Sequence, residues 1–237
     1  MIQLSEHFSY IKLMRFTIPT IAMMIFTSIY GVVDGLFVSN IVGSEAFAGV
    51  NLIMPALMML GSVGFMVGTG GSALVSKTIG EGNKKLANRY FSMLIYFLLI
   101  VGIVLSILGN AFIRQISELL GAKGEMVDIC STYGRTLLCS LPFFMLQNCF
   151  QSFLVVAEKP AMGLCVSVIA GLSNMVLDFL FIYVFRLGVF GAALATAISE
   201  FVGAAIPLIF FIRKNNSPLK LIKTKLELKP ILRTCSN

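Results

Sequence analysis

Three acidic residues interrupt long apolar stretches of the sequence, and their position gives them the strongest claim to a chemical role. Asp34, Asp178 and Glu200 each lie within a run long enough to cross a lipid bilayer. A carboxylate at the bilayer centre costs about 2.5–3.5 kcal/mol on insertion scales, so it needs a compensating role or contact with water. The alternative for each acid is a place near a helix end, where the side chain reaches the lipid headgroups.

The spacing of two of these acids from the nearest upstream basic residue is the same. Asp34 follows Arg15 by 19 positions, and Asp178 follows Lys159 by 19 positions. If both basic residues mark the inner membrane surface, both acids lie at a similar depth in the outer half of the membrane. This agreement favours one shared site over two unrelated positions.

Two neutral polar residues lie near the expected acidic pair. Asn174 precedes Asp178 by four residues and therefore shares its helix face. Thr196, four residues before Glu200, is expected at a similar depth on the last apolar run. The set of Asp34, Asn174, Asp178 and Thr196 would offer two carboxylates, an amide carbonyl and a hydroxyl, which are ligands that a hard cation such as Na⁺ prefers. The two carboxylates can instead share a proton, and separate helix-packing roles remain the alternative to a common site.

Motifs for enzymatic catalysis are absent from the sequence. The only histidine is His7, outside the apolar runs, and no phosphate-binding P-loop is present. The five cysteines show no metal-ligand spacing and are interpreted as small packing residues. The sequence therefore predicts no enzyme and no cofactor beyond a coupling ion, H⁺ or Na⁺, so transport would draw on an ion gradient or a partner.

The composition indicates the elements that must position these residues. The 237 residues are 57% apolar and only 12% charged, with a mean hydropathy of +0.92, whereas a soluble domain carries about 25% charged residues. A soluble enzyme, a disordered chain and a disulfide scaffold are poor fits. Membrane β-strands would alternate polar and apolar residues, which these runs do not. We therefore predict an all-α polytopic membrane protein with six spans: Phe16–Val33 continuing to Ile41, Ala46–Ser76, Tyr90–Ile113, Thr136–Ala157 with an earlier start near Cys130, Pro160–Leu177 continuing to Phe185, and Leu187–Ile212.

Basic residues are distributed unequally between the two sides of these six spans. Fourteen of the 18 Lys and Arg residues fall on the side of the two termini, three fall on the opposite side, and Arg135 lies near the start of the fourth span. The positive-inside rule then places both termini in the cytoplasm of a multi-pass protein of the cell membrane. We assign the net charge of +7 to topology and contact with anionic lipid, not to nucleic acid, because no basic-aromatic groove motif accompanies it.

The chain is divided into two parts by its composition. Residues 1–212 form the transmembrane unit, and residues 213–237 form a basic cytoplasmic segment. Leu219, Ile222 and Leu226 recur at helical spacing between lysines, which predicts an amphipathic helix on the membrane surface. In the second span, Gly64 and Gly68 have the spacing that allows two membrane helices to approach closely.

An ordered set of segments resembles the N-terminal half of a transporter of the multidrug and toxic compound extrusion (MATE) family, in its DinF-like and MepA-like branch. The resemblance covers essentially the whole chain, and no single tripeptide is diagnostic. The segments that carry it are Pro19–Val38, Gly43–Asn51, Gly68–Ala73, Gly80–Asn83, Asn174 with Asp178, and Gly188–Thr196.

The resemblance implies a site, an activity and a partner. Asp34, Asn174, Asp178 and Thr196 match the family's cation-site residues, and Pro19 marks a bend in the first helix. The implied activity is H⁺- or Na⁺-coupled export of amphipathic, often cationic drugs and toxic compounds. The family has two six-helix lobes, and alternating access rocks one repeat against the other. We therefore expect a second lobe as partner, either a missing C-terminal half or another copy, and read residues 213–237 as the start of the inter-lobe linker.

One acid and two rival functions remain open at this stage. Glu200 has no role implied by the resemblance; it is expected to add negative charge to a cavity, or to pair with Arg135 or a backbone donor. A related lipid-linked precursor flippase is the first rival, and it should line its cavity with more basic residues. An inactive fragment or a membrane interaction subunit is the second.

Overall fold

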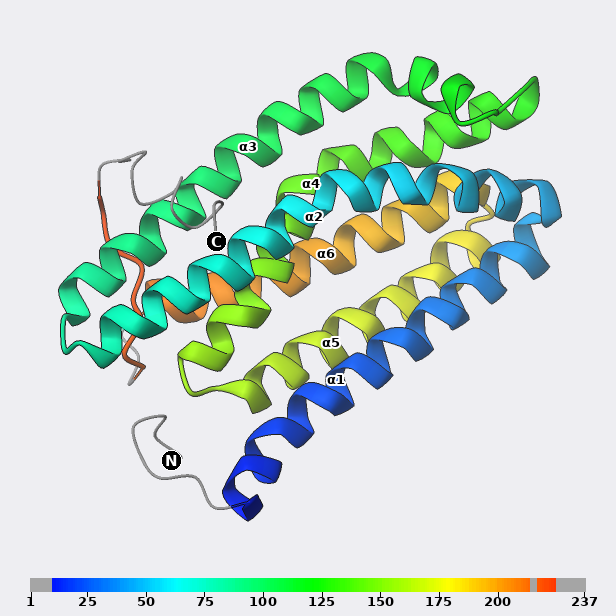
Figure 1. Ribbon diagram of the computed structural model, residues 1–237. Coiled ribbons are helices and arrows are strands. Elements are labelled where there is room, and N and C mark those ends of the chain that lie inside the picture. Colours follow the sequence, from blue (N-terminus) through cyan, green and yellow to red (C-terminus); the bar gives the residue numbers. More distant parts are fainter. Residues whose placement is uncertain (1–9, 214–216, 225–237) are drawn as a thin grey trace.

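The computed structural model describes residues 10–213 and 217–224, and these residues form a bundle of six long helices (Figure 1). No strand occurs in these two ranges, and the prediction of an all-α protein is confirmed. The elements are α1 (Tyr10–Phe37), α2 (Ser44–Gly80), α3 (Lys84–Leu119), α4 (Glu125–Val156), α5 (Pro160–Asp178) and α6 (Gly188–Ile212), with short π-helices η1 (Val38–Val42) after α1 and η2 (Phe179–Val184) after α5.

Each of the six helices is long and apolar enough to cross a membrane. The helices α2, α3 and α4 have 37, 36 and 32 residues, where about 20 suffice for one span. They begin or end beyond the predicted spans because charged residues can continue a helix outside the lipid. The fourth helix, for example, begins at Glu125, ahead of the predicted start near Cys130.

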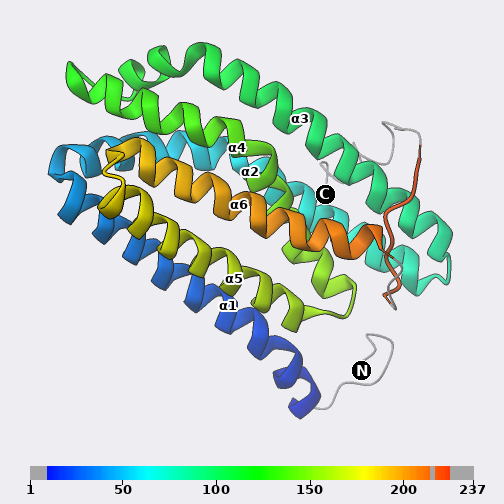
Figure 2. The same ribbon diagram turned by 180° about the vertical axis from the view of Figure 1, so that it is seen from behind.

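The connections alternate between the two ends of the bundle (Figures 1 and 2). The start of α1, the α2–α3 and α4–α5 connections and the end of α6 lie at one end. That end holds most of the described basic residues, among them Lys84, Lys85 and Lys159. At the other end Arg114 pairs with Glu118 and Asp128. The alternation agrees with six spans, while the assignment of the basic end to the cytoplasm stays a prediction.

Helix α4 lies at the centre of the bundle and packs against α2, α3 and α6, whereas α1 packs chiefly on α5. Small residues set the α2–α4 distance. A Cβ added at Gly64 would lie 2.5 Å from Met145 Cα, and one at Gly68 would lie 2.9 Å from Cys149 Cα. The predicted close approach at these two glycines is therefore present, and any larger side chain would force α2 and α4 apart.

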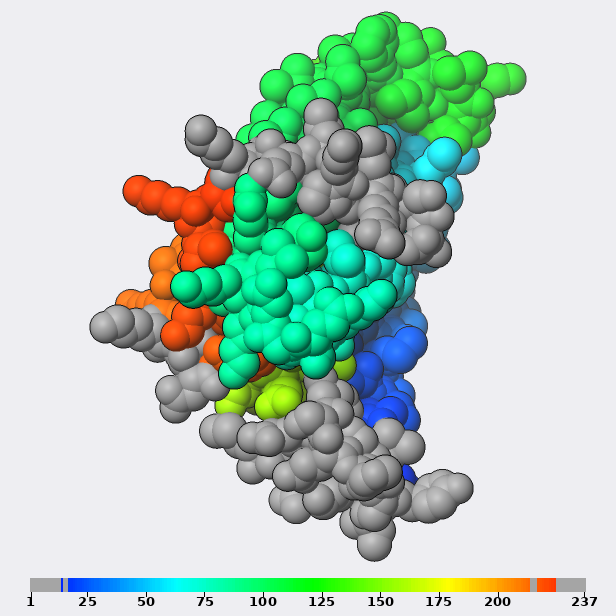
Figure 3. Space-filling view, turned by 60° about the vertical axis from the view of Figure 1, so that its left-hand side comes forward, coloured from blue at the N-terminus to red at the C-terminus, as the bar shows by residue number. Residues whose placement is uncertain are grey.

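The segment after α6 departs from the sequence prediction. Residues 217–224 are not helical, although Leu219 is fully buried. The backbone N–H groups of Lys220 and Ile222 donate to the side chains of Asn88 and Ser92 on α3, each at 2.8 Å. Because α3 supplies these acceptors, the segment is held against α3 without forming a helix, and its atoms adjoin those of α3 in the space-filling view (Figure 3). The predicted amphipathic helix is wrong for residues 217–224; Leu226 and residues 225–237 lie outside the described residues.

Candidate functional site

The four residues predicted to form a cation site come from three helices that meet at one place. Asp34 lies near the end of α1, Asn174 and Asp178 lie on the last two turns of α5, and Thr196 lies on α6. Helix α5 packs against both α1 and α6, which brings the four side chains together. The amide of Asn174 donates a hydrogen bond from Nδ2 to Thr196 Oγ1 at 3.4 Å.

The carboxyl groups of Asp34 and Asp178 are neighbours and interact directly with each other. Asp178 is fully buried, whereas Asp34 is half-buried. Two ionised carboxylates have no hydrogen to donate, so a bond between them requires a proton on one of them. A cation between the two groups would satisfy them equally well.

Unpaired oxygen atoms gather around this acidic pair. Asp34 Oδ1, both carboxylate oxygens of Asp178, Asn174 Oδ1 and the Tyr133 hydroxyl are buried, and no N–H or O–H group of the described residues donates a hydrogen bond to them. More than about 90% of buried polar groups in folded proteins are paired. Five orphaned oxygens in one cluster therefore fit a group that binds a proton or a hard cation, and the donor set, with two carboxylates, an amide and hydroxyls, suits Na⁺.

Sequence reasoning missed two tyrosines that lie at this site. Tyr133 on α4 is fully buried, and its hydroxyl lies near the Thr196 side chain and the acidic pair. Tyr30 on α1 lies close to both Asp34 and Glu200. The four-residue spacing of Tyr30 and Asp34 was a usable signal for one helix face. Tyr133 gave no such signal, because its direction depends on how α4 is rotated in the bundle.

Each acid of the pair lies in the helical turn before an irregular helical segment. Asp34 lies on the turn before η1, and Asp178 is the last residue of α5 before η2. In these π-helices the backbone N–H bonds five residues back, as in the 3.1 Å bond from Gly43 N to Val38 O. Such segments are rare and occur often at functional sites.

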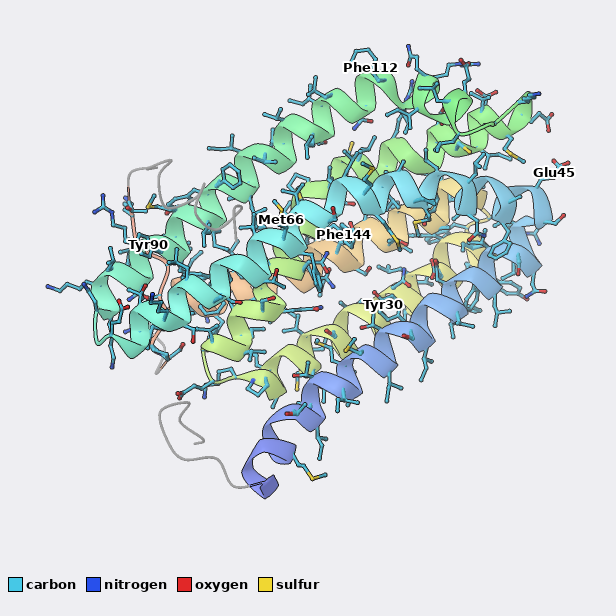
Figure 4. All side chains as sticks on the ribbon, viewed as in Figure 1. Tyr30, Glu45, Met66, Tyr90, Phe112 and Phe144 are labelled. Atoms are coloured by element: carbon cyan, nitrogen blue, oxygen red, sulfur yellow. The ribbon has the colours of Figure 1, made fainter. Side chains whose placement is uncertain are left out.

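A cavity of about 330 Å³ opens beside the acidic pair. It is lined by all of the long helices except α3, with Tyr30 on α1 and Phe144 on α4 among its walls (Figure 4). Asp34 lines the cavity, and the fully buried Asp178 lies behind it. The polar lining residues are Thr27, Tyr30, Asp34, Gln147, Asn174, Thr196, Ser199 and Glu200; the apolar side chains are Met54, Leu57, Met58, Leu137, Leu141, Phe144 and Ala170.

Glu200 also lines this cavity. Its Oε2 accepts a hydrogen bond from the Ser140 hydroxyl of α4 at 2.6 Å. Within the described residues no basic side chain pairs with Glu200. The expected partner Arg135 is exposed and lies in a separate groove between α4 and α6, beside Phe190 and Phe201. The expectation of cavity charge therefore fits the structure, whereas pairing with Arg135 does not occur.

Comparison with known proteins places this arrangement in a family. The MatE family model matches residues 19–180. The chain belongs to the MatE family. Among curated relatives, the multidrug export protein MepA of Staphylococcus saprophyticus is 29% identical over 204 residues, which are 86% of this chain and 45% of the relative. The MatE chain thus spans about half the length of the curated relatives it matches.

Solved structures of MATE transporters share the fold. A multidrug resistance MATE family transporter of the MOP superfamily in its outward-facing conformation aligns with a TM-score of 0.86 and 26% identity, covering 93% of this chain and 49% of that one. The inward-facing conformation aligns with a TM-score of 0.80 and 27% identity, covering 89% and 49%. These matches confirm that the six helices are one lobe, the N-terminal half, of a MATE-type transporter.

Proposed function

We propose that this lobe couples the entry of H⁺ or Na⁺ to the export of amphipathic, often cationic compounds. The observation that carries the proposal is the pair of Asp34 and Asp178, whose unpaired oxygens adjoin a cavity lined by apolar side chains. The multidrug export named for the MepA relative and the MATE structures agrees with such an activity. The proposed setting is the cell membrane, with both termini in the cytoplasm, because most basic residues lie at that end.

The order of the groups suggests how coupling works. Asp34 is the member of the pair that a proton or Na⁺ reaches from the cavity, since Asp178 lies behind it. Binding of the ion removes the repulsion between the two carboxylates and draws the end of α1 toward α5. Helix α1 is suited to such a shift, because little of it is buried inside the lobe. In the membrane-spanning stretch Thr17–Val42, only 6% of the most apolar part is buried. Movement of α1 changes the cavity wall that carries Tyr30 and displaces the compound.

A second six-helix lobe completes the transport path in this proposal. The chain covers 45–49% of the relatives and structures it matches. Alternating access in such repeats requires two units that rock against each other. The partner is either a C-terminal half or a second copy of this lobe.

The rival function of a lipid-linked precursor flippase receives no support from the cavity. Such a protein needs basic side chains near an anionic headgroup. None of the described Lys or Arg side chains lines the 330 Å³ cavity, and Arg135 lies in the separate outer groove. The export experiment below distinguishes a transporter lobe from an interaction subunit that transports nothing.

The test uses the product of the intact native gene, reconstituted in liposomes with an imposed H⁺ or Na⁺ gradient. We expect gradient-driven export of a cationic dye such as ethidium, and its loss in Asp34→Asn and in Asp178→Asn. Glu45→Gln is the matched control, because Glu45 is an exposed acid in the first turn of α2, outside the cavity (Figure 4). Normal export by folded Asp34→Asn and Asp178→Asn proteins would contradict the proposal, and no export by the wild type would favour an interaction subunit.

A further inference from the structure

Glu200 is an acid of the cavity that the proposed coupling pair does not use. Asp34 and Asp178 interact with each other, whereas the carboxylate of Glu200 is held by Ser140 on α4. Glu200 lies one turn beyond Thr196 on α6. The cavity therefore carries two separate acidic centres, one at the α1–α5 contact and one at the α4–α6 contact.

The surroundings of Glu200 leave its charge available to a ligand. The hydroxyl of Ser140 donates a hydrogen bond to Oε2 of Glu200. No described side chain donates to Oε1 of Glu200. A carboxylate that is partly shielded from water, as the half-buried Glu200 is, is costly unless a cation or several donors balance it. One hydroxyl is a weak balance for a full negative charge, so the position favours a positively charged guest.

The walls around this acid suit an organic cation better than a hydrated metal ion. Phe144 and Tyr30 offer aromatic rings, which attract cationic groups through their faces. Met54 and Met58 on α2 add flexible, polarisable thioethers that adapt to different shapes. The cavity volume of about 330 Å³ lies at the lower end of the range for small-molecule sites, about 300–1,000 Å³.

We propose that Glu200, positioned by Ser140, is the counter-ion for the positively charged group of the transported compound and determines the preference of this lobe for lipophilic organic cations over neutral molecules of similar size. This inference rests on the proposed export function for its biological meaning. The ion pair itself is a binding property, so it is measured separately from transport.

The test measures binding of two probes to the protein purified from the membranes of cells that express the intact native gene. Tetraphenylphosphonium is the cationic probe, and triphenylphosphine oxide is a neutral molecule of similar shape. We expect Glu200→Gln to lower the ratio of cation affinity to neutral-probe affinity by at least about tenfold, the scale expected when one partner of a desolvated charge pair is removed. Glu200→Asp keeps the charge and should retain a preference for the cation.

Two further variants separate a charge effect from a structural one. Ser140→Ala keeps the Glu200 carboxylate but removes the hydroxyl that fixes its position in the cavity, so we expect severalfold weaker cation binding with a smaller change for the neutral probe. Glu45→Gln removes an exposed acid outside the cavity and should keep the wild-type ratio. Ser140→Ala also gives the answer if Glu200→Gln fails to fold.

The outcomes distinguish this inference from the function on which it rests. An unchanged affinity ratio in Glu200→Gln, or an equal loss of both probes, would overturn the role of Glu200 even if gradient-driven export still depends on Asp34. Absence of gradient-driven export by the wild type would overturn the proposed function, whereas a selective loss of cation binding in Glu200→Gln would still support the ion pair.

Discussion

At the residue scale, removal of the Tyr133 hydroxyl can distinguish a structural role of this group from a role in ion binding. It is buried, and it has no hydrogen-bond partner among the described residues. Removal of an unpaired buried hydroxyl is expected to be neutral or stabilising, because its desolvation cost disappears. A hydroxyl that binds the coupling ion behaves differently, since its loss weakens only the ion-bound state.

We therefore expect Tyr133→Phe to keep or raise the melting temperature in ion-free buffer and to reduce the rise in melting temperature that the coupling ion causes. Ligand binding stabilises a protein in proportion to the logarithm of ligand concentration over Kd, so this rise reports affinity. The measurement is thermal unfolding of the purified protein with and without Na⁺, and at two pH values for H⁺. Tyr96→Phe is the control, because Tyr96 bonds to Ile222 away from the site. An undiminished ion effect in Tyr133→Phe would exclude the hydroxyl from the site.

The sequence spacing anticipated that Asp34 and Asp178 are neighbours, whereas their depth in the membrane stays a prediction. Counting 19 residues from a basic flank to each acid works because a helix rises regularly through the membrane. The structure brings Asp34 and Asp178 within reach of each other, as the equal spacing suggested. Partners that depend on helix rotation were not predictable: Tyr133 and Ser140 both lie on α4, and nothing in their spacing shows which face of α4 points to the cavity.

At the element scale, the contact between α2 and α4 depends on glycine. We expect Gly64→Ala to destabilise the lobe by about 1–3 kcal/mol, the usual cost of overpacking a filled interior, because its Cβ would meet the backbone of Met145 at 2.5 Å. Gly80→Ala on the same helix is the matched control, since a Cβ there meets nothing within 4 Å. The thermal aggregation temperature of the detergent-solubilised protein gives the comparison. Equal temperatures for the two variants would contradict the close contact.

A second element-scale prediction concerns the segment held against α3. Removal of its acceptors in the double variant Asn88→Leu with Ser92→Ala should release residues 217–224. In a background with alanine at the native cysteines, Leu219→Cys reports this change, because Leu219 is fully buried when the segment is docked. We expect a water-soluble maleimide to label Leu219→Cys slowly in the docked protein and several times faster in the double variant. Lys223→Cys, at an exposed position, should react rapidly in both, and rapid labelling of Leu219→Cys in both would contradict docking.

The error for this segment shows where helical periodicity misleads. Leu219 and Ile222 have helical spacing, but three-residue spacing fixes a helix only if the backbone N–H groups bond within the segment. Here Asn88 and Ser92 of α3 accept them instead. The six spans were predictable because lipid offers no such alternative acceptors, which forces each apolar run to satisfy its own backbone.

At the scale of the whole molecule, α1 and α2 expose large apolar side chains that either lipid or a second protein unit must cover. Ile25 on α1 and Met59 and Phe65 on α2 are 57%, 78% and 58% exposed. Lipid tails cover apolar side chains well, so exposure alone does not separate lipid from protein. The decisive features are that α1 and α2 also form walls of the cavity and that the matched transporters are about twice as long. Under the proposed export function, the cavity wall that this lobe forms needs a second wall.

We therefore expect the native assembly that contains this chain to have a protein mass of about twice 25.8 kDa. Native mass spectrometry of membranes from the source cells gives the mass of the assembly, and denaturing electrophoresis then separates a single two-lobe chain from a pair of copies. A pair of copies would place two acidic pairs and two Glu200 residues around one path, because a homodimer repeats each site. An assembly of 25.8 kDa that still exports ethidium would contradict the two-lobe mechanism, since one lobe would then provide both walls by itself.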